Sequence, residues 1–113
     1  MAKLAGTPKI AILLALLALA GCDRTPNELL VDNQGTQTAV VNVDYHATDG
    51  RHRHVHQQFE VPPGQIVVGE YHRIDSMDVL ITRLSDGLVL LQTSYDQRDF
   101  DDDHGRIELA VTP

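Results

Sequence analysis

The segment TAVVNVDYH, residues 38–46, alternates apolar and polar side chains over most of its length. Successive side chains of a β-strand point to opposite faces, so this alternation predicts a strand with one buried face and one wet face. The expected apolar face holds Val41, Val43 and Tyr45, and the polar face holds Asn42, Asp44 and His46.

The next segment, RHRHVHQQFEV (residues 51–61), has the same pattern, with three histidines on its polar face. The two strands can form a hairpin only if their apolar faces turn to the same core. A two-residue turn at Asp49-Gly50 would set those faces on opposite sides. A three-residue loop, residues 48–50 with Gly50 left-handed, keeps them matched. The predicted register pairs Val43 with Val55 inside, and His46 with His52, Asp44 with His54 and Asn42 with His56 outside.

Short runs rich in β-branched residues recur through the rest of the chain, separated by turns that contain glycine. No window after Cys22 shows a clear helical period, so DQRDFDDDHG (residues 96–105) is expected to be a loop with Phe100 tucked beneath it. The pattern predicts an all-β domain over residues 28–113, a small antiparallel β-sandwich of immunoglobulin or transthyretin-like style. The predicted strands span residues 29–32, 38–46, 53–61, 66–71, 78–84, 88–94 and 106–112.

The polar face of the predicted hairpin carries four imidazoles and a carboxylate, from His46, His52, His54, His56 and Asp44. These groups are ligands for Zn²⁺ or Cu²⁺, and opposed side chains on paired strands are close enough to share an ion. Two other interpretations stay open. The histidines can be ordinary polar residues on the wet side of a sheet, or they can give a pH response, because protonating six histidines would move the mature charge from −9 to −3.

A second candidate cation site lies in the acidic segment before the last predicted strand. Asp99, Asp101 and Asp103 have the spacing of the first three ligands of a Ca²⁺-binding EF-hand loop. The glycine and the glutamate that such a loop needs later are replaced by His104 and Ala110. The alternatives are therefore a generic carboxylate cage or a solvated acidic turn, partly neutralised by nearby arginines.

The first 22 residues have the parts of a secretory signal. Lys3 and Lys9 give a positive start, and residues 10–20 form an apolar stretch of eleven residues. A helix needs about 20 apolar residues to cross a bilayer, so this stretch fits a signal core and not a stable span.

The segment Leu19-Ala20-Gly21-Cys22 resembles the lipobox of bacterial lipoproteins, and the resemblance covers residues 1–22 alone. It implies that residues 1–21 are removed, that Cys22 is lipidated, and that the mature chain is anchored to a membrane without spanning it. Several acyl chains on one residue exceed what stable attachment requires. Asp23, directly after the cysteine, resembles the signal that retains such lipoproteins in the inner membrane, facing the periplasm; the outer membrane is the alternative.

The predicted mature chain, residues 22–113, is long enough for one small domain. Because Cys22 is its only cysteine, no disulfide within it is expected. All sixteen acidic residues and seven arginines lie in this part, so its formal charge is −9. This charge argues against binding nucleic acid and against lying flat on an anionic membrane. Residues 22–27 are expected to be a short linker, since five residues reach about 18 Å at most.

The sequence contains no recognised nucleophile–base motif and no phosphate-binding glycine loop, so we do not expect an enzyme. The function that it favours is a membrane-anchored, non-enzymatic binding or accessory module of the cell envelope, with an envelope protein as partner. The alternative is a periplasmic Zn²⁺- or Cu²⁺-binding protein that uses the histidine-rich strand face.

Overall fold

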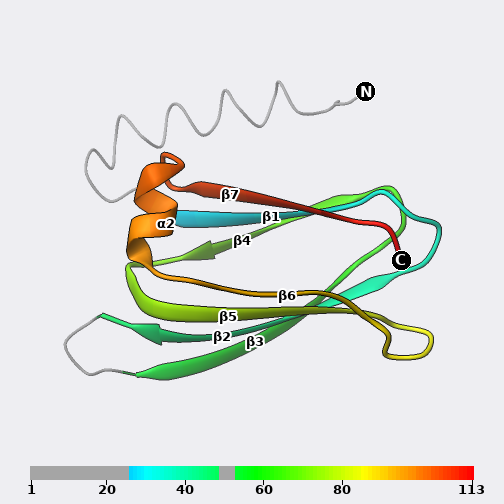
Figure 1. Ribbon diagram of the computed structural model, residues 1–113, viewed down its shortest axis with the longest axis horizontal. Helices are drawn as coiled ribbons and strands as arrows, with labels where there is room; N and C mark the ends of the chain where they lie inside the picture. Colours follow the sequence, from blue (N-terminus) through cyan, green and yellow to red (C-terminus); the bar gives the residue numbers. More distant parts are fainter. Residues whose placement is uncertain (1–25, 49–52) are drawn as a thin grey trace.

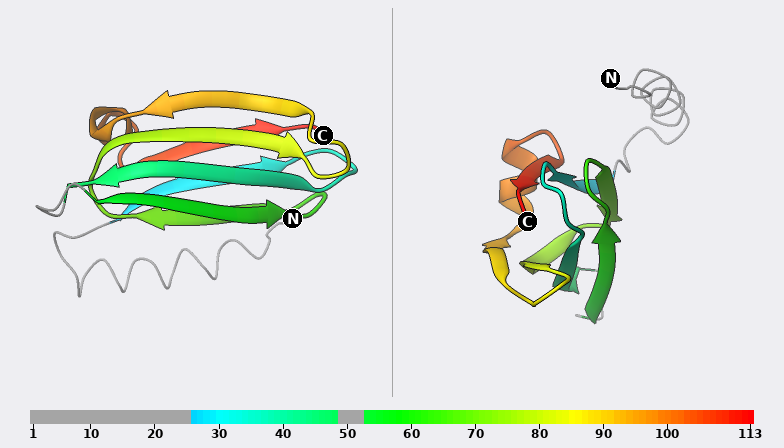
Figure 2. Two further views of the ribbon diagram at one scale, coloured as in Figure 1. Left: turned by 90° about the horizontal axis from the view of Figure 1, so that it is seen from below. Right: turned by 90° about the vertical axis from the view of Figure 1, so that its right-hand side faces the viewer.

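The computed structural model describes residues 26–48 and 53–113. Seven strands form two stacked sheets, and the short helix α2 (Gln97–Asp102) closes one end of the stack (Figure 1). The two layers are seen end-on in Figure 2. The small all-β sandwich expected from the sequence is therefore confirmed.

One sheet has three strands in the order β4-β1-β7. β1 (Asn27–Asn33) is central, with β4 (Ile66–Tyr71) antiparallel to it and β7 (Arg106–Val111) parallel to it. The parallel pair is a departure from the purely antiparallel arrangement that was expected. It arises because the chain crosses from the other sheet through α2 before β7 begins.

The second sheet has four antiparallel strands in the order β3-β2-β5-β6. Immunoglobulin constant domains have a different order, with their first, second, fifth and fourth strands in one sheet. The domain therefore shares two stacked sheets with that class, but its strands are ordered differently within the sheets. The strand bounds are β2 (Ala39–Ala47), β3 (His54–Val61), β5 (Ile74–Arg83) and β6 (Val89–Tyr95).

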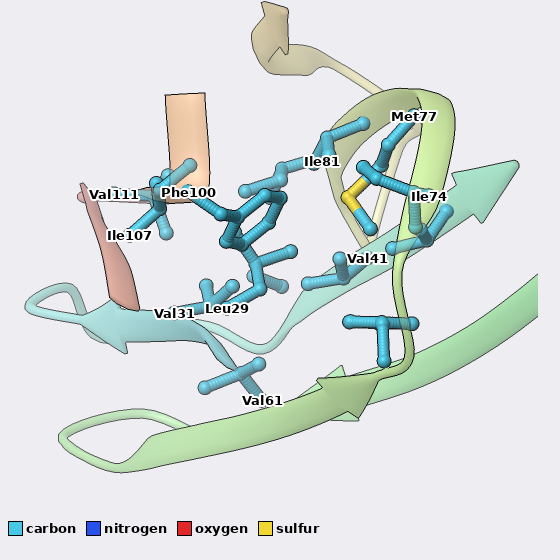
Figure 3. Packing of buried hydrophobic residues seen from close by; sticks show 14 residues of the cluster. Leu29, Val31, Val41, Val61, Ile74, Met77, Ile81, Phe100, Ile107 and Val111 are labelled. Atoms are coloured by element: carbon cyan, nitrogen blue, oxygen red, sulfur yellow. The ribbon is translucent and has the colours of Figure 1, made fainter. Parts of the chain in front are cut away.

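The core lies between the sheets and is filled from both of them (Figure 3). Full burial of one such apolar side chain stabilises the fold by about 1.5–3 kcal/mol. The predicted faces of β2 are confirmed, since Val41 and Val43 are fully buried and His46 is exposed. The largest fully buried side chains are Phe100, Leu29, Ile74, Met77 and Ile81.

Tyr71 connects the two sheets at the end of β4. Its hydroxyl donates to Gln57 Oε1 on β3 at 2.6 Å, and its ring meets that of Tyr45 edge-on with 5.2 Å between centroids. The ring lies over Gly69, where an added Cβ would come within 2.6 Å of the Tyr71 hydroxyl. A side chain at this position in β4 would therefore force the buried Tyr71 ring to move.

The expectation that residues 96–105 form a loop is wrong over Gln97–Asp102, which is the helix α2. The helix begins with a capping box, in which Asp96 Oδ1 accepts from Asp99 N at 3.1 Å and Asp99 Oδ2 accepts from Asp96 N at 2.9 Å. Phe100, fully buried, fixes the helix to the core, so its predicted burial is confirmed.

Candidate functional site

The polar face of the β2–β3 hairpin brings together three of the predicted site histidines and their carboxylate. Asp44 Oδ1 lies 2.8 Å from His56 Nδ1 and 3.3 Å from His54 Nε2. The rings of His46 and His54 are 4.9 Å apart between centroids. His52, the fourth predicted histidine, lies outside the described residues.

The hairpin register differs by two residues from the predicted one. The structure pairs Asp44 with His56 and His46 with His54, whereas the predicted partners are His54 and His52. Ala47 N donates to Arg53 O at 2.9 Å, so five residues connect the strands instead of three. A shift of two preserves which face each side chain occupies, and the polar face is therefore the predicted one.

Asp44 is the electrostatic centre of this face. The hydrogen bond from His56 holds the pKa of the Asp44 carboxyl below its usual value, and the positive charge that His56 and His54 can carry acts in the same direction. β5 is the other neighbour of β2 in the sheet, and its residue Asp78 is paired with Asp44. Asp78 accepts a hydrogen bond from Ser94 Oγ at 2.6 Å. The face thus combines two carboxylates with three exposed imidazoles.

The described part of this cluster does not form a metal centre. His54 Nε2 and His56 Nδ1 both lie against the same oxygen of Asp44, so one ring nitrogen of each imidazole is engaged. Among residues 26–48 and 53–113, no group of three or more His, Cys, Asp or Glu side chains is arranged to hold a metal ion. What the geometry shows is a cluster of polar side chains joined by short contacts to Asp44.

The predicted cation loop at Asp99, Asp101 and Asp103 is replaced by α2 and its C-cap. Side chains two positions apart on a helix point in different directions, so the three carboxylates do not converge on one point. Asp99 belongs to the capping box, and Asp101 Oδ1 accepts from Gln97 Nε2 at 3.0 Å. The EF-hand-like spacing therefore has no counterpart in the structure.

A hollow of about 270 Å³ lies where α2 meets the start of β1 and the β4–β5 turn; sequence reasoning did not find it. Its floor is a side-chain amide pair between Asn27 and Gln97, at 2.8 and 3.0 Å. Asn27, which the sequence analysis placed in the linker, is the first residue of β1 and is buried. The lining residues are Asn27, Arg73, Gln97, Asp101, His104 and Gly105.

The histidine face and the hollow belong to the same end of the sandwich. β1 begins there beside α2, β2 ends there, and β4 turns into β5 there, as Figure 1 shows at the left. The opposite end carries the β5–β6 turn and the C-terminus. Both candidate binding sites therefore lie at the end of the sandwich where β1 begins.

The predicted lipidation and sorting residues, Cys22 and Asp23, lie outside the described residues. Within residues 26–48 and 53–113, no helix is both long and apolar enough to cross a membrane. No protein-family model matches this chain, and neither a curated protein nor a solved structure matches it.

Proposed function

We propose that this chain is the precursor of a bacterial lipoprotein whose β-sandwich is a non-enzymatic binding or accessory module of the cell envelope. The observation that carries the proposal is Leu19-Ala20-Gly21-Cys22, placed directly after two lysines and an apolar core. In this proposal residues 1–21 are removed and Cys22 carries the lipid.

The fold supports a short distance between domain and membrane. β1 begins at Asn27, and the five residues after Cys22 that lead to it reach about 18 Å when extended. The end of the sandwich that carries the histidine face, α2 and the hollow is then the end nearest to the bilayer. A partner that meets this end is a component of the membrane or lies close to it.

The charge of the domain favours a partner with a basic surface. Mature residues carry a formal charge of −9, and complementary charges raise association rates and exclude wrong partners. We therefore propose a protein or other envelope component with a positive patch as the binding partner. Crosslinking in intact cells, followed by mass spectrometry of the crosslinked chains, is the way to find it.

Metabolic labelling with palmitate in a bacterial host tests the anchor. Wild type should take up the label, lose residues 1–21 and remain with the membranes after a carbonate wash. The Cys22→Ala variant should take up no label and keep its signal segment or leave the membrane. Equal membrane retention of the two proteins, with the cysteine thiol bare in wild type, would refute the proposal.

Asp23 supports inner-membrane retention as the finer localisation. Separating inner and outer membranes tests this, with Asp23→Ser as the comparison. Wild type should band with the inner membrane, and the variant should move to the outer one. If both proteins band with the same membrane, Asp23 does not act as a sorting signal.

A further inference from the structure

The hollow beside β1 has two opposite charges at its mouth. Arg73 Nη2 and Asp101 Oδ2 are 3.9 Å apart, and the two side chains are 70% and 56% exposed. This distance is too long for a hydrogen bond, so the ion pair is a loose one. In the described part of the chain, the guanidinium and one carboxylate oxygen are therefore available to a ligand.

The wall behind these charges is fixed by hydrogen bonds. Gln97 Oε1 accepts from both Asn27 Nδ2 and Ile74 N, at 2.8 and 3.1 Å, while Gln97 Nε2 donates to Asp101 Oδ1. Glu28 N donates to Gly105 O at 2.7 Å, which ties the chain after α2 to β1. Asp101 thus projects from a braced wall. Arg73 projects from the β4–β5 turn, where its carbonyl oxygen accepts from Thr48 N at 3.2 Å.

The chain after α2 reaches the rim of the hollow through a left-handed helix end. His104 has φ 58° and Gly105 has φ 84°, and left-handed residues commonly end a helix. Gly105 N donates to Phe100 O at 2.6 Å, which closes the last turn of α2. This helix end places His104 among the residues that line the hollow.

A guanidinium and a carboxylate side by side select a ligand with an anionic group and an ammonium group. Guanidinium binds phosphate through charge-assisted hydrogen bonds. Asp101 can accept hydrogen bonds from a primary ammonium, but a trimethylammonium has no N–H to donate. Because Asp102 and Asp103 add further negative charge nearby, a ligand without an ammonium group is disfavoured.

We propose that the hollow binds the phosphoethanolamine headgroup of a membrane phospholipid, with Arg73 on the phosphate and Asp101 on the ammonium. The proximity of the membrane rests on the proposed lipid anchor, because Asn27 lies five residues from Cys22. The chemistry of the site rests on the hollow alone. Binding would orient the domain on its bilayer in spite of its overall negative charge.

The first test uses the processed full chain in detergent and O-phosphoethanolamine as the probe, followed by NMR. Saturable shifts should be centred on the resonances of Asn27, Gln97, His104 and Gly105, and phosphocholine should bind about tenfold more weakly, as expected for loss of charge-assisted hydrogen bonds. Arg73→Gln and Asp101→Asn should each weaken phosphoethanolamine binding to a similar extent. Their matched controls are Arg98→Gln and Asp102→Asn, which make the same charge changes outside the hollow and should bind as wild type does.

The second test places the lipidated chain in nanodiscs of phosphatidylcholine with or without phosphatidylethanolamine. The same resonances should shift when phosphatidylethanolamine is present, in wild type and not in Arg73→Gln. No saturable shift with the soluble probe, or equal binding of phosphocholine, would overturn the site. Binding of the soluble probe without any response to the lipid would overturn the membrane headgroup as the ligand.

The lipid anchor is read out separately by the mass of the purified chain. An acylated chain that ignores the probe refutes the headgroup site and leaves the anchor in place. A chain with a bare cysteine that binds the soluble probe refutes the anchor and leaves the chemistry of the hollow in place. The two proposals therefore fail in distinguishable ways.

Discussion

Asn27 and Gln97 exchange two side-chain hydrogen bonds across 70 residues of sequence, from the first residue of β1 to the first residue of α2. Gln97 also accepts from Ile74 N at the start of β5. One amide side chain thus connects α2 to a strand of each sheet. The helix that carries most of the acidic segment is held in place by this junction and by Phe100.

Replacing Gln97 with Ala should lower the free energy of unfolding by about 1–3 kcal/mol, because the Ile74 N–H loses its acceptor and the buried Asn27 amide keeps only its bond to His72 O. Denaturant unfolding followed by circular dichroism measures this difference. Arg98→Ala, one position along the same helix, is the matched control and should stay within about 0.5 kcal/mol of wild type. If both variants unfold at the same denaturant concentration, the junction is not stabilising.

Phe100 is expected to contribute more than the helix cap does. Phe100→Ala should lower the free energy of unfolding by about 3–5 kcal/mol, since it empties a fully buried position. Asp96→Ala, which removes the N-cap acceptor, should lower it by about 1 kcal/mol. The same unfolding measurement compares them, and a cap variant less stable than the Phe100 variant would contradict this order.

The period of two in residues 38–46 and 53–61 was sufficient to predict which side chains of the hairpin face the core. It could not fix the register, because loops of three and of five residues both keep the apolar faces together. Asp44 was accordingly paired with His54 where the structure pairs it with His56. The alternation of apolar and polar residues determines which face of the sheet a side chain occupies. The length of the loop between the strands determines which residue it is paired with across the hairpin.

Elements that depend on contacts distant in sequence escaped prediction. α2 has six residues, too few to show a helical period, and its clearest signal is the pair Asp96 and Asp99 at capping-box spacing. The Asn27–Gln97 pair depends on how the two layers stack around α2, which no local pattern encodes. The hollow could therefore not be predicted, because nothing in the sequence indicates that Arg73 and Asp101 lie side by side.

Stability at alkaline pH should depend on Tyr71. Burial, and to a smaller extent the neighbouring Tyr45, raises the pKa of Tyr71 from 10.0 to about 12. The unfolded chain releases this proton first, so the folded state loses stability as the pH rises through the interval between these two values. Tyr71→Phe should flatten that loss in unfolding measurements made from pH 9 to 12.

Absorbance of the phenolate gives an independent measurement of the same group. The phenol that ionises at the highest pH in the folded wild type should be missing from the titration of Tyr71→Phe. Tyr95→Phe, which removes another partly buried phenol, should retain it. A highest-pH step that survives in Tyr71→Phe would show that the step belongs to a different tyrosine.

Zinc and copper titrations should reveal no tight site on the histidine face. Among residues 26–48 and 53–113, no three His, Cys, Asp or Glu side chains are arranged to hold a metal ion, and a tight Zn²⁺ site needs three or four protein ligands. Calorimetry with the purified chain, prepared without chelators, measures the affinity. Tight stoichiometric binding in wild type that disappears in a His54→Ala, His56→Ala double variant would establish the metal centre and contradict this expectation.

The pairing of Asp44 with His56 should make the hairpin sensitive to acid. The His56 hydrogen bond lowers the pKa of Asp44 in the folded chain below the ordinary value of 3.8 that the unfolded chain retains. The stabilisation is therefore present above that value and is lost as the pH falls below it through the folded pKa, since the unfolded chain then binds the proton more readily. Asp44→Asn should reduce this acid-side slope in unfolding curves recorded between pH 5 and 2.

His56→Asn removes the main cause of the shift and should have the same effect, with no further change when the two substitutions are combined. Additive slopes in the double variant would mean that Asp44 and His56 titrate independently and that their short contact contributes nothing to the acid response.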